Sequence, residues 1–137
     1  MVSSNGLGHL DSQLLAKGTF RTDPRSLAPI RTFVRRWAEE AGVDPERSSR
    51  MQLAVVEACA NAVDHPEEAG DITLWAWRHL DHFRIDVSHL GEFRVKDGEG
   101  RRHRGMGLPL MVASADEVTF ARLPEGGVRV SLSVFLK

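Results

Sequence analysis

The chain has 137 residues, of which 42% are hydrophobic and 27% are charged, the composition of a globular protein of one domain. The chain has eighteen Lys and Arg residues and nineteen Asp and Glu residues, a balance that argues against a basic nucleic-acid-binding module. Its single cysteine excludes a disulfide framework and a cysteine-based zinc cluster. No apolar run reaches the ~18–20 residues of a membrane span, so we expect a cytoplasmic domain that binds neither membrane nor, directly, nucleic acid.

The N-terminal third is expected to hold an arm, a strand and an amphipathic helix. Residues 1–13 are rich in Ser, Gly and Asn, which predicts a flexible arm followed by one folded domain over residues 14–137. Alternating apolar residues predict a strand over residues 14–21. A Thr-Asp-Pro start signature around Asp23 precedes apolar residues at spacings of three and four, which predict a helix that ends at Gly42.

The middle of the chain is expected to form a buried helix and a hairpin. Pro45 follows a capping aspartate, and residues 51–63 are nearly all apolar or strong helix formers. Cys59 lies in this segment and is expected to be a small core residue rather than a nucleophile. Residues 71–78 and 83–88 alternate between apolar and polar side chains, which predicts two strands joined by a tight turn.

The C-terminal third begins with a long polar segment. Residues 89–105 are rich in glycine and lack periodicity, and loops of that length in a small domain usually carry function. A third helix is expected from about residue 107 to 114, followed by strands over residues 118–122 and 128–136. This order predicts an α/β two-layer sandwich, in which a mixed, mostly antiparallel sheet carries three helices on one face.

One polar stripe interrupts the buried helix. Glu57 and Asn61 are four residues apart, so they project from the same face about one turn apart, and His65 continues the stripe if the helix is long enough. A carboxylate in an apolar helix is costly unless it is paired, coordinated or directed into a cleft. The stripe is therefore either a ligand site or a structural glutamate that reaches an arginine such as Arg104.

Two glycine-containing segments are further candidate ligand sites. Residues 105–108 read Gly-Met-Gly-Leu and open the third helix, where free backbone N–H groups favour a phosphate. Gly91 comes just after the strand that ends at residue 88, where a glycine lets a ligand ring lie against the backbone. Each segment alone is equally compatible with an ordinary turn.

The combination of these features in this order resembles the GHKL (Bergerat-fold) ATP-binding domain. More narrowly, it resembles the small anti-sigma factor serine/threonine kinases of bacterial partner switching. Residues 53–65 are similar to the first nucleotide box of that family, residues 105–111 are similar to its later glycine box, and the similarity extends over residues 14–137. The resemblance implies a Bergerat fold and a homodimer that uses ATP and Mg²⁺, phosphorylates a STAS-type anti-anti-sigma protein and sequesters a sigma factor.

The resemblance also implies a role for individual residues. Glu57 corresponds to the general base for a serine hydroxyl of the partner protein, Asn61 to the Mg²⁺ ligand, and residues 92–104 to the lid over the nucleotide. Arg31 and Arg35, on the first helix, correspond to a partner-binding surface. The implied nucleotide-binding residues are Asn61, His65, His89, Gly91, Gly105, Met106, Gly107 and Leu108.

The sequence departs from the family pattern at the adenine-binding box. The family has Asp-x-Gly-x-Gly there, and its aspartate accepts a hydrogen bond from the adenine amino group. Here His89 stands at the aspartate position and Phe93 at the second glycine, while Gly91 matches. Two hypotheses follow: an ATP-dependent protein kinase, favoured by Glu57 and Asn61, or a non-catalytic partner-switching module with weak or lost ATP binding, favoured by His89.

Overall fold

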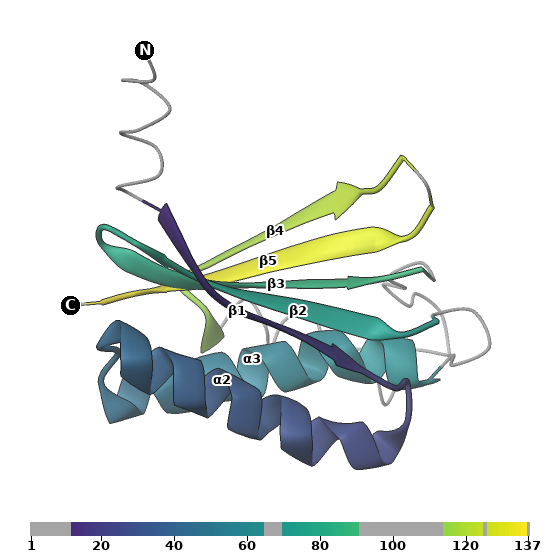
Figure 1. Cartoon of the computed structure of the whole chain (residues 1–137), viewed down its shortest axis with the longest axis horizontal. Helices are drawn as coiled ribbons and strands as arrows, with labels where there is room; N and C mark the ends of the chain where they lie inside the picture. Colours follow the sequence, from purple (N-terminus) through teal and green to yellow (C-terminus); the bar gives the residue numbers. More distant parts are fainter. Residues whose placement is uncertain (1–11, 65–69, 91–113, 125, 137) are drawn as a thin grey trace.

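Within the described part of the chain, two α-helices cover one face of a five-stranded sheet (Figure 1). The computed structural model describes residues 12–64, 70–90, 114–124 and 126–136. The strands are β1 (Ser12–Phe20), β2 (Ile72–His79), β3 (His82–His89), β4 (Glu117–Arg122) and β5 (Val128–Phe135), in the spatial order β1-β2-β3-β5-β4. A short 3₁₀ turn η1 (Pro24–Ser26) leads into α2 (Leu27–Ala41), and α3 (Pro45–Asp64) follows.

The predicted two-layer sandwich is confirmed. Each pairing between the described strands is antiparallel. The expected third helix falls on residues 107–114, of which all but the last lie outside the described residues, as does the expected arm up to residue 11. Strand β1 begins at Ser12, two residues earlier than the alternation predicts, because Ser12 and Gln13 continue the ladder opposite the end of β2.

The start of η1 and the C-terminal end of α2 follow the local signals in the sequence. The Asp23 carboxylate accepts a hydrogen bond from the backbone N–H of Arg25 at 2.8 Å and also pairs with the Arg25 guanidinium. These contacts with Arg25 lower the pKa of Asp23 to about 2. Gly42 adopts φ +88° and its N–H reaches back to the carbonyls of the last turn, a conformation that favours glycine.

The core lies between the helices and the inner face of the sheet. Every second side chain of β2 and β3 enters it, and α2 and α3 contribute one face each. Cys59 is fully buried, and this burial raises the pKa of its thiol to about 12, which confirms the predicted core role. The largest fully buried side chains are Phe83, Ile30, Met51, Ile72, Leu74, Ile85, Leu132, Val34, Val55, Val87 and Val130.

The outer face of the sheet carries aromatic and cationic side chains. The ring of Trp75 has the Lys17 ammonium and the Arg129 guanidinium each 5.7 Å from its centroid, and Arg84 lies 5.3 Å from Trp77. These cation–π contacts cover two large indoles on a face that no described helix covers.

Candidate functional site

The predicted polar stripe lies in the C-terminal half of α3. Because the helix is continuous through both positions, Glu57 and Asn61 project from one face, one turn apart. Glu57 is partly buried, and Asn61 is only 6% exposed. The side-chain nitrogen of Asn61 is buried and has no hydrogen-bond partner among the described residues. This group is an N–H donor, and a buried donor without an acceptor is costly, so an acceptor atom from outside the described segments would fit here.

His89 reaches the same end of the sandwich from the sheet. It is the last residue of β3, and it is in phase with the core residues Phe83, Ile85 and Val87, so alternation directs its side chain toward the helices. The side chain is 4% exposed. Figure 1 shows β3 and α3 ending on the same side of the molecule. Asn61 from one layer and His89 from the other therefore face the space between the layers.

The backbone around His89 is fixed by the start of β5. His89 pairs with Val128 in the ladder between β3 and β5. Gly127, at φ +94°, lies so close that a Cβ on it would overlap the His89 carbonyl oxygen and lie 2.8 Å from the Leu90 Cα. This close approach requires a glycine at position 127. The ladder pairing with Val128 keeps the His89 backbone within a regular strand.

Several predicted site residues lie outside the described part of the chain. The structure places Glu57 and Asn61 in the C-terminal half of α3, His89 at the end of β3, and Arg31 and Arg35 on the exposed side of α2. The residues that fall outside are His65, Gly91, Phe93, Arg104, Gly105, Met106, Gly107 and Leu108, together with the lid over residues 92–104.

A set of contacts that the sequence did not indicate, here called the anchor, joins Arg50 of α3 to Ser114 and Asp116 in the segment before β4. Arg50 donates to the Ser114 carbonyl at 3.2 Å and lies 3.6 Å from the Asp116 carboxylate. Asp116 also accepts a hydrogen bond from the backbone N–H of Phe135 at 2.8 Å. The anchor fixes the point where the chain re-enters the sheet after the predicted lid and third helix. A single arginine on a helix has no pattern that reveals such a long-range contact.

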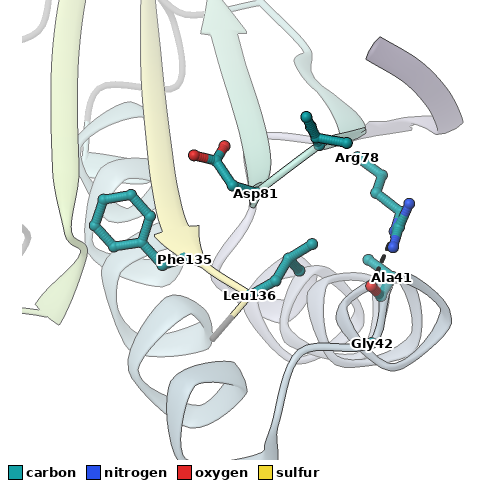
Figure 2. A pocket seen from close by; sticks show the side chains of 7 residues that line it. Ala41, Gly42, Arg78, Asp81, Phe135 and Leu136 are labelled. Carbon is teal, nitrogen blue, oxygen red and sulfur yellow. Dashed lines mark hydrogen bonds between the residues drawn. The ribbon is translucent and has the colours of Figure 1, made fainter. Parts of the chain in front are cut away.

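The cavity of about 640 Å³ shown in Figure 2 lies at the other end of the molecule. Its walls come from the end of α2, the turn between β2 and β3, and the end of β5. Asn61 lies 16 residues after the start of α3, about 24 Å along the helix axis at 1.5 Å per residue. Arg78, which lines this cavity, donates its Nε–H to the Ala41 carbonyl at 3.1 Å. The cavity is therefore separate from the site at Asn61 and His89.

The donor set at the end of α3 suits a magnesium–phosphate ligand. In the described segments, no group of three or more His, Cys, Asp and Glu side chains could hold a metal ion. An asparagine amide oxygen is a hard ligand that Mg²⁺ accepts when phosphate oxygens and water complete its shell. The Asn61 amide oxygen is therefore of the ligand type that Mg²⁺ prefers.

A comparison with protein families gives a match that covers Glu57, Asn61 and His89. The family model described as histidine kinase-like ATPase domain matches residues 20–134, from the end of β1 almost to the end of β5. No curated protein matches the chain. The part of the chain that the structure describes holds no helix long and apolar enough to cross a membrane.

Proposed function

The chain belongs to the histidine kinase-like ATPase family, and on this premise we propose that it is an anti-sigma regulatory factor with ATP-dependent protein serine kinase activity. Its substrate would be a STAS-type anti-anti-sigma protein, its second partner a sigma factor, and its assembly a cytoplasmic homodimer. The observation that carries the proposal is the position of Glu57 and Asn61 one turn apart on one face of α3, within the segment that matches this family.

The proposed chemistry uses these residues in separate roles. The Asn61 amide oxygen would hold Mg²⁺, which, when bound with ATP, neutralises charge on the phosphates. Glu57 would accept the proton of the partner's serine hydroxyl as the serine oxygen forms its bond to the γ-phosphorus. The bond between the γ-phosphorus and the bridging oxygen breaks, and ADP leaves. Positioning and charge stabilisation supply most of the rate in such a transfer.

A second candidate function is favoured by His89. Its position at the end of β3, where the family has an aspartate, supports a partner-binding module with weak or lost ATP binding. Mixing the protein with radiolabelled ATP and the STAS-type proteins of the same organism separates the two functions. Phosphate transfer supports the kinase. Partner binding without nucleotide binding supports the module.

Replacement of Glu57 by glutamine tests the general base. Glu57→Gln keeps the size and polarity of the side chain but removes the proton acceptor, so we expect phosphate transfer to fall about 10²–10⁴-fold. ATP binding should stay within about threefold of wild type, because the nucleotide contacts in the proposal come from other residues. The matched control is Glu46→Gln, an exposed glutamate in the first turn of the same helix. Equal transfer rates for Glu57→Gln and wild type would exclude the assigned role.

The exposed face of α2 is the proposed sigma-factor surface. Arg31 donates to the Gln52 side chain at 3.2 Å, which ties it to α3, while Arg35 lies one turn further along on the same exposed face. Arg35→Glu is expected to weaken sigma-factor binding at least about tenfold, because reversal of a charge in an interface adds repulsion to the lost attraction. Binding of the sigma factor is measured by calorimetry with ADP present.

The matched control for this surface is Arg36→Glu. Arg36 is also exposed on α2, and its guanidinium lies 4.9 Å from the Trp37 ring centroid. The change in net charge is identical, so a general electrostatic effect would weaken binding equally in both variants. Unchanged binding in Arg35→Glu, or equal losses in both, would contradict the assignment of Arg35.

A further inference from the structure

The outer face of the sheet, on the side away from α2 and α3 in Figure 1, carries large apolar side chains. Core residues alternate along the strands, so the residues between them point outward, and cross-strand partners share a face. The large apolar residues of this face are Leu14, Trp75, Trp77 and Phe135. Leu14 is 48% exposed and Phe135 is 52% exposed. The water-facing side of an antiparallel sheet is normally polar, so these side chains indicate contact with another protein surface.

The two edges of the outer face carry opposite charges. Lys17 on β1 pairs with Trp75, and Glu117 on β4 pairs with Ser133, so both lie on the outer face. In the strand order, β1 is one edge of the sheet and β4 is the other. Lys17 and Glu117 are exposed, and neither forms an ion pair with another residue of the described segments. A basic edge and an acidic edge make this face complementary in charge to a second copy of itself.

A twofold axis along the middle strand brings the opposite edges together. With the strand order β1-β2-β3-β5-β4, rotation about β3 places β1 of one copy over β4 of the other. Lys17 then lies over the strand that carries Glu117 in the other copy, and the contact occurs twice. Two further cations of this face already have partners within the chain, since Arg84 lies 3.0 Å from the Asp86 carboxylate and Arg129 lies over an indole ring.

The outer face is large enough for a stable dimer. Its five strands, spaced by about 4.8 Å and each about eight residues long, give a face of roughly 24 Å by 26 Å. Protruding side chains raise the accessible area above this flat area of roughly 600 Å². A standard interface buries about 800 Å² per partner, so contact over the whole outer face reaches that size.

We propose that the outer face of the sheet is the surface through which two copies of this chain form a dimer. The inference rests on the homodimer of the proposed function and assigns the surface that holds it together. The two sheets pack face to face as in a β-sandwich, with the indoles between them and the charged edges opposite each other. Both helix layers, and Asn61 with them, lie on the far sides of the sheets and stay accessible to ligands.

Sedimentation equilibrium of the full chain tests the charged edges. Wild type is expected to be a dimer at about 10 μM, and Lys17→Glu should weaken dimerisation at least about tenfold, because each dimer acquires two repulsive contacts. The double variant Lys17→Glu with Glu117→Lys exchanges the two charges and should restore dimerisation. Arg36→Glu makes the same change of charge on the exposed side of α2, and as the matched control it should leave dimerisation unchanged.

The apolar part of the outer face is tested by Leu14→Arg. The Leu14 side chain is exposed in a single copy, so an arginine there leaves the core intact, but in the dimer it becomes a buried charge without a partner. We expect dimerisation to weaken at least about tenfold. The matched control is Leu53→Arg, the same change at a leucine of α3 that is 40% exposed, and this variant should stay dimeric.

Monomeric wild-type protein at about 100 μM would overturn the inference and the proposed homodimer together, whereas nucleotide binding and phosphate transfer are measured separately from both. A wild-type dimer that Lys17→Glu and Leu14→Arg weaken no more than their controls do would overturn the inference alone. The same conclusion holds if the charge-exchanged double variant dimerises no better than Lys17→Glu.

Discussion

Asn61→Ala is expected to abolish Mg²⁺-dependent nucleotide binding, with a loss of affinity of at least about a hundredfold, or about 2.7 kcal/mol. The substitution removes the amide oxygen that would hold Mg²⁺, and no other buried polar side chain of the described part of α3 lies within one turn of it. The affinity is measured by calorimetry with ATP, with and without Mg²⁺.

The melting temperature of the unliganded protein distinguishes a role of Asn61 in ligand binding from a structural role. Because the Asn61 side-chain nitrogen is buried and has no partner in the described segments, removing the amide should not lower the unliganded melting temperature by more than a few degrees. Binding of Mg-ATP to the folded state raises the melting temperature of the wild-type protein. In Asn61→Ala this rise should disappear.

The matched control for Asn61 is Gln52→Ala. Gln52 is the other buried amide of α3, and it bonds to Ser48 at 3.0 Å and accepts from Arg31. Its loss should destabilise the fold but leave nucleotide affinity unchanged. Retained Mg-ATP affinity in Asn61→Ala, or an equal loss in Gln52→Ala, would contradict the assignment of Asn61.

Gly127→Ala is expected to be the more damaging of two alanine substitutions in the same turn. Gly126 and Gly127 both have positive φ, at +100° and +94°, which is strained for alanine. A Cβ at Gly126 has no atom within 4 Å, whereas one at Gly127 overlaps the backbone of His89 and Leu90. We expect a loss of unfolding free energy of about 1–2 kcal/mol for Gly126→Ala and about 2–5 kcal/mol for Gly127→Ala.

Urea unfolding of both variants measures this difference. The midpoint should fall in both, and further in Gly127→Ala, with slopes close to wild type. Since the clash displaces the end of β3, Gly127→Ala should also weaken the proposed nucleotide binding, whereas Gly126→Ala should not. Equal losses of stability in the two variants would show that Gly127 is not constrained by its contact with β3.

Local signals in the sequence predict most of the fold. Asp23 caps η1 and Gly42 caps the end of α2, and both caps depend on residues within a few positions, so the start of η1 and the end of α2 can be read from the sequence. The same holds for the stripe of Glu57 and Asn61, because helical periodicity alone puts them on one face. The start of β1 at Ser12 could not be read in this way, since it depends on pairing with His79, 67 residues away.

The other differences between the sequence-based predictions and the structure arise because residues that are distant in the sequence bury a side chain. Alternation in β3 predicts that Asp86 belongs to the polar face, yet it is 6% exposed. Its cross-strand neighbour is Trp75, and its carboxylate lies 3.0 Å from the Arg84 guanidinium, so large side chains of the outer face cover it. The anchor formed by Arg50 and Asp116 is likewise set by tertiary structure. Periodicity identifies the face of a side chain but not the neighbours that cover it.

We propose that Asn61 and His89 belong to a site for a magnesium-bound nucleotide. This is tested by calorimetric titration of the wild-type chain with ATP in the presence of Mg²⁺. We expect saturable binding of about one nucleotide per chain, which is lost when the metal is chelated. Absence of binding at millimolar ATP with Mg²⁺, together with an unchanged melting temperature, would contradict it.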